Sequence, residues 1–296
     1  MHDLRFFMTD VFGNEKYSGN QLATFLEGGL LSEYEMQKIA REINFSETTF
    51  ILSDRTIDGG YPVRIFTPAE EIDFAGHPTL GTAFIISRHI FKQHAGKVVL
   101  NLNVGQIPVS FSSADNQSTL WMEHLEPTFG GVLNAGIVAE MLGLPADALD
   151  GRCPVQEVST GLPHVIVPLK NLDALRKAAL VKERYFDVIK DIPSKCILIF
   201  CPEGHDESHA VSVRMFADLL GIPEDPATGS GNGCLAAYLV KHRYFGSNAI
   251  DISVGQGYEI GRPSLILLKA EEINGGRIRV SVGGRVIPIA EGFWYL

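Results

Sequence analysis

The sequence predicts an α+β fold in which mixed or antiparallel sheets wrap around helices, rather than a doubly wound parallel sheet. Predicted helices are few and widely spaced along the 296 residues, and many predicted strands follow one another without a helix between them. In addition, two glycine-rich turns, each opening onto an apolar helix, lie roughly half the chain apart. We interpret this pair as an internal duplication, with one central helix in each of two pseudo-symmetric domains.

The composition fits a globular protein, and the length suggests about two domains. The hydrophobic fraction of 45% is ample for two packed cores. The formal net charge of −10 argues against nucleic acid as a partner, because a phosphate-binding face needs a basic stripe and we find none. The longest basic cluster, residues 241–243, follows a predicted helix and more simply complements the helix dipole.

No segment predicts export or membrane insertion. The apolar run near the N-terminus is too short for a signal peptide, and no run approaches the roughly 20 residues of a membrane span. The four cysteines include no CxxC pair; they are Cys153, Cys196, Cys201 and Cys234. We therefore expect reduced thiols in a cytoplasmic protein.

The N-terminal half is expected to be mostly strands. Ser32 and Glu35 form a capping box, which predicts a helix that ends near Ile43. The composition turns polar at 112–118, and we place the domain boundary nearby. The strands expected in this half are 4–12, 21–26, 48–52, 63–67, 98–103, 106–111 and 119–122.

The first glycine-rich turn, 74–81, runs into an apolar helix that continues to about Ile86. Pro78 is expected at the first helical position, where its missing N–H costs nothing. An acidic connection, 68–73, precedes the turn. The same order of acid, turn, small polar residue, glycine and buried helix recurs at 224–240, which is why we predict a duplication.

The C-terminal half is expected to contain two further helices, 134–142 and 172–180. Residues 160–163 are predicted as a turn, and the turns 255–257 and 261–264 bracket a short hairpin-like piece. The strands expected here are 155–159, 164–168, 195–201, 212–216, 250–254, 265–269, 277–282 and 285–289.

The second glycine-rich turn begins at Gly221 and opens onto an uncharged helix that runs to Val240. The N–H groups at the start of this helix, with the hydroxyls of Thr228 and Ser230 beside them, predict an anion site. Asp225 stands at its rim. Asp225 is either an N-cap or a functional carboxylate, and the small residues that follow favour the functional interpretation.

Other motifs were weighed and set aside. The glycines after Thr228 do not have dinucleotide-binding spacing, and no Gly-Lys-Ser/Thr loop is present. Cys201, His205 and His209 have a spacing compatible with a metal site, but they follow a turn in a polar stretch, which favours incidental histidines. Glu47, at the start of a predicted strand, is by itself either a solvated strand end or a catalytic carboxylate.

Five segments, in this order, resemble the PhzF-like isomerase family of phenazine biosynthesis. They are Ser46-Glu47-Thr48-Thr49-Phe50, Arg64-Ile65-Phe66-Thr67-Pro68, Phe74-Ala75-Gly76-His77-Pro78-Thr79-Leu80-Gly81, Glu224-Asp225-Pro226-Ala227-Thr228-Gly229-Ser230, and the stretch from Gln256-Gly257 to Gly261-Arg262-Pro263-Ser264.

This resemblance implies a diaminopimelate epimerase-like fold, in which each domain is a sheet rolled around a central helix with the site in the cleft. We expect one domain at 1–116, joined by the last strand at about 286–296, and another at 117–285. The resemblance also implies a homodimer and no cofactor. From the residues themselves we expect no metal and no membrane partner. The catalytic residues that it implies are Glu47, His77, Asp225 and Ser230, and the substrate-binding residues are Ser46, Gly76, Thr228 and Gly229.

The implied chemistry is a cofactor-independent proton shift on a small carboxylate. Burial raises the pKa of a glutamic acid toward neutrality, so Glu47 would take a proton from one carbon and return it to another. A two-thiol racemase is disfavoured because Cys234 lies inside the second helix. A non-catalytic binding protein on the same scaffold remains the alternative. Gln21 and Asn232 depart from the usual family pattern, and Asn232 either reaches the pocket or caps a turn.

Overall fold

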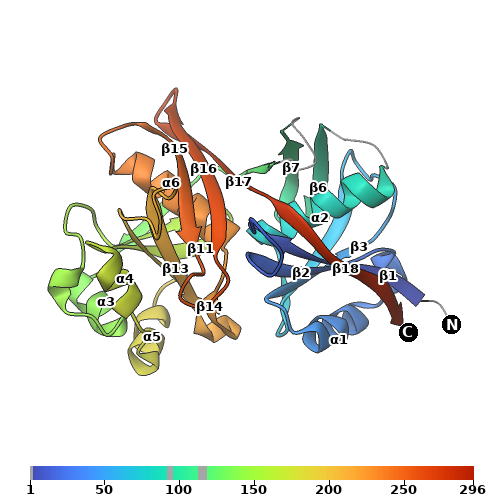
Figure 1. Cartoon of the computed structure of the whole chain (residues 1–296), viewed down its shortest axis with the longest axis horizontal. Coiled ribbons are helices and arrows are strands. Elements are labelled where there is room, and N and C mark those ends of the chain that lie inside the picture. The colour runs from blue at the N-terminus through green and yellow to red at the C-terminus, as the bar shows by residue number, and fades with distance from the viewer. Residues whose placement is uncertain (1–2, 92–95, 113–118) are drawn as a thin grey trace. The chain divides into compact units, whose positions relative to one another are not determined.

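The computed structural model describes residues 3–91, 96–112 and 119–296, which divide into two compact units (Figure 1). Unit 1 combines the chain up to Glu123 with Gly283–Leu296, and unit 2 is His124–Val282. The last strand of the chain thus belongs with the N-terminal strands. The polar segment 112–118, except Ser112, lies outside the described residues, so the domain boundary expected beside it stays a prediction.

Unit 1 contains one outer helix, α1 (Glu33–Ile43), and one central helix, α2 (Gly76–Ile85), which continues as a π-helical turn over Ile86–Ile90. Its strands are β1 (Asp3–Val11), β2 (Asn20–Phe25), β3 (Glu47–Ile51), β4 (Tyr61–Phe66), β5 (Glu71–Ile72), β6 (Lys97–Leu102), β7 (Gly105–Phe111), β8 (Leu120–Glu123) and β18 (Val286–Tyr295).

Unit 2 contains the outer helices α3 (Ala135–Met141), α4 (Leu172–Lys177) and α5 (Lys182–Ile189), and the central helix α6 (Gly229–Lys241). Its strands are β9 (Thr128–Val132), β10 (Gln156–Ser159), β11 (Pro163–Pro168), β12 (Cys196–Cys201), β13 (Val211–Ala217), β14 (Ile222–Asp225), β15 (Ala249–Gln256) and β16 (Ser264–Ile273), and β17 (Arg277–Gly284) leads back to unit 1.

The strands of the two units pair in the same order and with the same directions. In unit 1 the order is β18, β1, β2, β3, β4, β6, β7. In unit 2 it is β9, β10, β11, β12, β13, β15, β16. In both, the third and fifth pairings are parallel and the others antiparallel. The predicted duplication and the mixed sheets of an α+β fold are confirmed.

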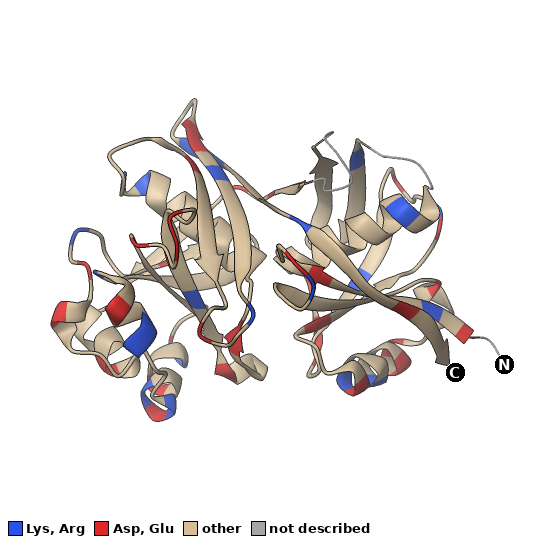
Figure 2. Ribbon diagram, in the orientation of Figure 1, with Lys and Arg blue, Asp and Glu red and all other residues tan. Residues whose placement is uncertain are grey.

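A buried helix lies at the centre of each sheet, as predicted. Every residue of α2 is buried, and α2 contacts β1, β2, β3, β6, β7, β8 and β18. Gly229–Val240 of α6 is likewise buried, against β10, β11, β12, β15 and β16. A helix enclosed on all sides must be apolar all round. Figure 2 shows the consequence, because charged residues lie on the outer helices and strand ends and the central helices are uncharged along most of their length.

The turn before each central helix is fixed by an arginine–glutamate pair. Arg64 of β4 binds the carboxylate of Glu71 through two nitrogens, and Arg214 of β13 binds Glu224 in the same way, at 2.9 and 2.8 Å. Each guanidinium also lies over the phenylalanine two residues on, 5.1 Å from the Phe66 ring centre and 5.0 Å in the second case. A bidentate pair fixes direction as well as distance. The duplication therefore extends to side chains.

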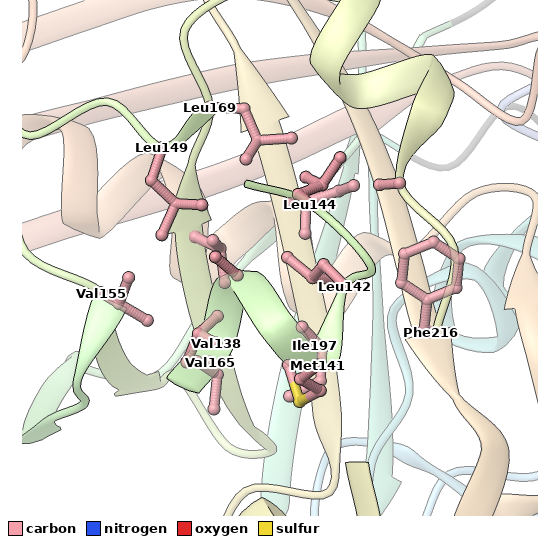
Figure 3. Packing of buried hydrophobic residues seen from close by; sticks show 14 of the residues in the cluster. Val138, Met141, Leu142, Leu144, Leu149, Val155, Val165, Leu169, Ile197 and Phe216 are labelled. Carbon is pink, nitrogen blue, oxygen red and sulfur yellow. The ribbon is translucent and has the colours of Figure 1, made fainter. Parts of the chain in front are cut away.

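Outer helices complete a further layer in each unit. The capping box of α1 is confirmed, since Ser32 N donates to Glu35 Oε2 at 2.8 Å and Glu35 N donates to Ser32 Oγ. In unit 2, a second apolar cluster joins α3 to the sheet (Figure 3). It includes Val138 and Met141 of α3, Leu142 just after that helix, and Val165 and Ile197 of β11 and β12.

Several local predictions were wrong. Pro78 is the third residue of α2, not the first, because the helix begins at Gly76. Residues 222–225 form the strand β14 rather than a turn, and its Pro223 is tolerated there because an edge strand can spare an N–H. The helix expected at 172–180 ends at Lys177. The last strand runs over Val286–Tyr295, paired with β1, which agrees with the bounds of about 286–296 expected from the domain division rather than with 285–289.

Three elements were missed altogether: the two-residue strand β5, in the expected acidic connection, the strand β9 and the helix α5. The strand β9 contains two glycines and shows no alternation, and it is a strand because β10 supplies its hydrogen bonds. The helix α5 starts without a capping side chain at Val181, so the sequence offered no start signal. Packing against the core through Tyr185 and Ile189 keeps α5 helical.

We expect Glu224→Gln to lower the free energy of unfolding by about 3 kcal/mol, because it leaves the guanidinium of Arg214 without its carboxylate in a buried site. The two side chains are only 10% and 11% exposed. Glu71→Gln should cost less, about 1 kcal/mol, because its pair is more exposed and Arg64 keeps Glu33 as a second partner. Urea unfolding measures both losses, and equal losses would contradict burial as the cause.

Candidate active site

In unit 1 the fold brings Glu47 and His77 together. Glu47 is the first residue of β3, and His77 is the second residue of α2. Glu47 Oε2 lies 3.3 Å from His77 Nε2, and the two side chains are 12% and 4% exposed. Ser46 and Gly76 precede these residues directly, so all the predicted site residues of this unit lie on two segments that meet where β3 contacts α2.

A third residue, Asn20, was not predicted as part of this site. Its Nδ2 lies 3.1 Å from His77 Nδ1, and both side chains are buried. The parallel register that pairs Leu22 with Glu47 carries the start of β2 to this place. Gly19-Asn20 was the available signal, but without the register nothing in the sequence connects it to a histidine 57 residues away.

The imidazole of this site is neutral near pH 7. Burial lowers the pKa of His77 to about 3, and a backbone hydrogen bond with Gln21 opposes this shift only in part. The contact with Glu47 is therefore not an ion pair. A neutral imidazole can share a proton with a neighbouring carboxyl group without fixing that group in its charged form.

In unit 2 the predicted residues lie at the start of α6. Asp225 ends β14, Thr228 is the N-cap of α6, and Gly229 and Ser230 are its first two residues. Thr228 Oγ1 donates to Asp225 Oδ2 at 2.5 Å, and Thr228, Ser230 and Asp225 are all buried. The N-cap interpretation of Asp225 is thus wrong, because Thr228 holds that position.

Asn232 ties this turn together. Its Nδ2 donates to the Thr228 carbonyl at 3.0 Å and to Gln256 Oε1 at 2.9 Å. In unit 1, Thr79 Oγ1 donates to the Ala75 carbonyl, which is the corresponding N-cap carbonyl of α2. Of the two interpretations left open for Asn232, the structure shows the turn-bracing one.

Two histidines that the sequence did not indicate pack against the first turns of α6. A Cβ at Gly233 would lie 2.3 Å from His124 Cε1, and one at Gly231 would lie 3.0 Å from His164 Cδ2. His124 Nδ1 is 2.8 Å from Thr160 Oγ1. Burial lowers the pKa of His164 to about 4. The glycines after Ser230 are thus explained by close ring contacts, and Gly-x-Gly within a helix was the only signal.

The cysteine nearest this site is not a nucleophile. Cys234 is fully buried, with Sγ 3.6 Å from the Leu162 carbonyl and from Thr160 Oγ1. Burial raises the pKa of this thiol to about 11. A thiolate is the reactive form, so two-thiol chemistry has no support here.

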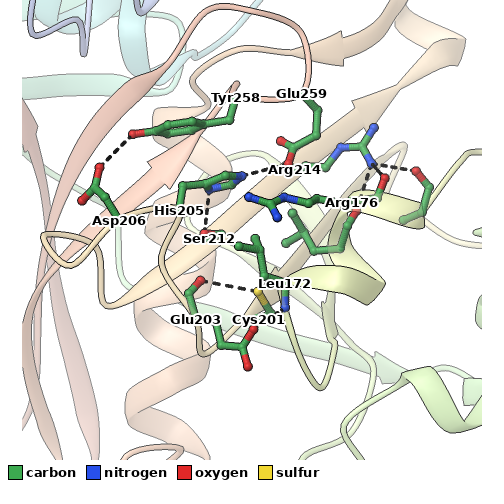
Figure 4. A network of polar contacts seen from close by, with 12 residues as sticks. Leu172, Arg176, Cys201, Glu203, His205, Asp206, Ser212, Arg214, Tyr258 and Glu259 are labelled. Atoms are coloured by element: carbon green, nitrogen blue, oxygen red, sulfur yellow. Dashed lines mark hydrogen bonds and ion pairs between the residues drawn. The ribbon is translucent and has the colours of Figure 1, made fainter.

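Two of the residues weighed as a metal site, Cys201 and His205, instead make hydrogen bonds to other residues of unit 2 (Figure 4). His205 Nε2 lies 2.9 Å from Glu259 Oε1, and His205 Nδ1 lies 2.8 Å from Ser212 Oγ. The His205 ring stacks on Tyr258 with ring centres 4.0 Å apart. Within residues 3–91, 96–112 and 119–296, no three or more His, Cys, Asp or Glu side chains are grouped as metal ligands.

Among the described residues, no helix is both long enough and apolar enough to cross a membrane.

Comparisons with known proteins agree across the whole chain. Residues 9–292 match the family described as phenazine biosynthesis-like protein, PhzC-PhzF. The chain is 34% identical over 293 residues to trans-2,3-dihydro-3-hydroxyanthranilate isomerase of Pseudomonas aeruginosa, with 99% of each covered. A phenazine biosynthesis protein of the PhzF family from Bacillus anthracis matches with a TM-score of 0.90 and 28% identity, over 100% of both chains.

A more distant structure shares the fold alone. A probable proline racemase from Agrobacterium radiobacter K84 matches with a TM-score of 0.66 at 11% identity, over 99% of this chain and 93% of that one. This likeness agrees with the predicted epimerase-like fold.

Gly233→Ala should destabilise the protein by about 1–3 kcal/mol, because the new methyl group collides with the His124 ring. The same change in an open helix would stabilise it by up to about 1 kcal/mol. Adding His124→Ala should remove most of the loss, so a double-mutant cycle of thermal unfolding gives a large coupling energy. Additive losses would show that the ring contact is not the cause.

The free energy of unfolding should decrease as the pH is lowered below about 6.5. The folded pKa values of His77 and His164 are about 3 and about 4, below the ordinary value of 6.5, so the unfolded chain binds more protons in that window. Each group should contribute a slope that approaches about 1.4 kcal/mol per pH unit. Urea unfolding between pH 7 and pH 5 measures it. His164→Leu should flatten the curve, and parallel curves for the variant and the native protein would contradict the assignment.

Proposed function

This chain belongs to the phenazine biosynthesis-like (PhzC-PhzF) family and is an isomerase, and on that premise we propose that it catalyses a cofactor-independent proton shift on a small carboxylate. The observation that carries the proposal is the buried pair of Glu47 and neutral His77 at the start of a helix. A carbon acid beside a conjugated system needs one base whose pKa suits neutral pH, and a carboxyl group in a dry site meets that need.

In the proposed reaction Glu47 is the general acid/base. Its carboxylate takes a proton from one carbon of the substrate, and the resulting carboxylic acid returns it to another carbon of the delocalised system. No electrons are lost or gained, so no cofactor is required. The neutral His77 supports both forms of Glu47 by hydrogen bonding, because it neither repels the carboxylic acid nor holds the carboxylate in a permanent ion pair.

The other predicted residues would bind the substrate. We propose that Ser46 before β3, Gly76 at the start of α2, and Gly229 and Ser230 at the start of α6 bind polar groups of the substrate, with the helix N-termini favouring its carboxylate. Asp225 would then orient a polar group of the substrate.

The substrate panel follows from the relatives. The Pseudomonas aeruginosa relative is named for trans-2,3-dihydro-3-hydroxyanthranilate, a cyclic amino carboxylate, so this compound heads the panel. Other small cyclic and amino carboxylates complete it. We further propose, from the family resemblance, that the active form is a homodimer.

In D₂O, native protein should exchange or shift a C–H proton of one compound of the substrate panel. NMR of that compound measures the rate. Glu47→Gln should lower that rate by about 10²–10⁴-fold, because the amide cannot accept the proton. Glu157→Gln is the matched control, since Glu157 is also a buried carboxyl group but lies on β10 and accepts from the Ser194 amide. It should keep the native rate.

Two results would overturn the proposal. One is a Glu47→Gln variant that exchanges as fast as native protein. The other is native protein that binds panel members with no exchange of any of them, which would favour the non-catalytic binding protein.

A further inference from the structure

Gln256, the last residue of β15, makes four hydrogen bonds from a side chain with no exposed surface. Its Nε2 donates to the Asp225 carbonyl and to Thr228 Oγ1, both at 2.9 Å. Its Oε1 accepts from Thr228 N at 3.2 Å and from Asn232 Nδ2 at 2.9 Å. One amide thus joins the strand that ends at Asp225 to the start of α6.

The orientation of this amide is unambiguous. A backbone N–H can only donate, so the atom facing Thr228 N must be the oxygen. A backbone carbonyl can only accept, so the atom facing the Asp225 carbonyl must be the nitrogen. The same reasoning fixes Asn232, whose nitrogen faces the Thr228 carbonyl. No hydrogen position has to be assumed.

The amide in turn fixes the direction of the Thr228 hydroxyl. Because Gln256 Nε2 donates to Thr228 Oγ1, the hydroxyl hydrogen must point elsewhere, and Asp225 Oδ2 lies 2.5 Å away. That distance is typical of a hydroxyl donating to a charged carboxylate. Asp225 is therefore held as an acceptor, with one oxygen oriented by a hydroxyl that cannot rotate away.

The equivalent place in unit 1 is built differently. The residue after β6 there is Asn103, whose Nδ2 contacts Asp73 Oδ1 at 3.2 Å and Glu71 Oε1 at 3.4 Å in an exposed position. The buried four-bond amide is thus particular to the turn that carries Asp225. Fold duplication alone does not account for it.

We propose that Gln256 is a positioning residue, which acts through the Thr228 hydroxyl to orient Asp225 and keep it ionised for the reaction. The proposal rests on the proposed function, because it takes Asp225 to be an active-site group. Gln256 itself does not touch the substrate.

Gln256→Met and Thr228→Val test this directly in the proton-exchange assay. Each should lower kcat by about 10–100-fold with KM changed less than about threefold, because orientation matters most in the transition state. The double variant should be no slower than the slower single variant, since both changes remove the same oriented hydroxyl.

A pH profile separates positioning from general loss of structure. Without the oriented hydroxyl, the carboxylate loses a donor that stabilises its charged form, so the acidic limb of the rate should move to higher pH in Gln256→Met. Gln256→Glu preserves size and the Oε1 acceptor but loses the donor, and should move the limb further. The control is Gln156→Met, which removes another bridging amide of unit 2 and should leave kcat and the limb unchanged.

A native kcat in Gln256→Met, additive losses in the double variant, or an unmoved acidic limb would each overturn the proposal. If native protein turns over no panel member, the proposed function fails, and amide hydrogen exchange still tests Gln256. The Thr228 N–H, which Gln256 Oε1 accepts, should lose protection in Gln256→Met and keep it in Gln156→Met. Unchanged exchange protection of the Thr228 N–H would by itself overturn the proposed role of Gln256.

Discussion

Enclosure of a whole helix inside a sheet is the constraint on which the rest of this protein depends. Because α2 and α6 are buried all round, neither can carry a charge inside its sheet, and the backbone groups at their first turns must be met by nearby protein. That requirement is met by the short strands β5 and β14, by the arginine–glutamate pairs that anchor them, and by the glycines of the first turns. Small residues at a helix start also leave room for a ligand.

Duplication gave the molecule two such helix starts, and they have diverged in chemistry. One presents a neutral histidine beside a glutamic acid, and the other presents a carboxylate held by a threonine hydroxyl. The bracing differs as well. A side chain bonded to the N-cap carbonyl occurs in both halves, through Thr79 and Asn232, and in the second half the fully buried amide of Gln256 lies beneath the turn.

Desolvation keeps the histidine and the cysteine near the two helix starts uncharged. Burial lowers the pKa of His77 to about 3, so its imidazole stays neutral through the physiological range. The buried thiol of Cys234 is kept protonated by the same desolvation. The same buried surroundings make the fold sensitive to acid.

The sequence by itself determined the α+β class, the duplicated turn and helix and the capping box at Ser32, because these depend on local composition and on motifs a few residues long, whereas Glu47 and His77 became candidates only through the family resemblance. Only the tertiary structure decided that Asn20 meets His77, that Gln256 lies beneath Thr228, that His124 requires Gly233, and that β9 is a strand at all. These contacts join residues far apart in the chain. They are set by strand register and by the space left between packed elements, and neither leaves a periodic signal in the sequence.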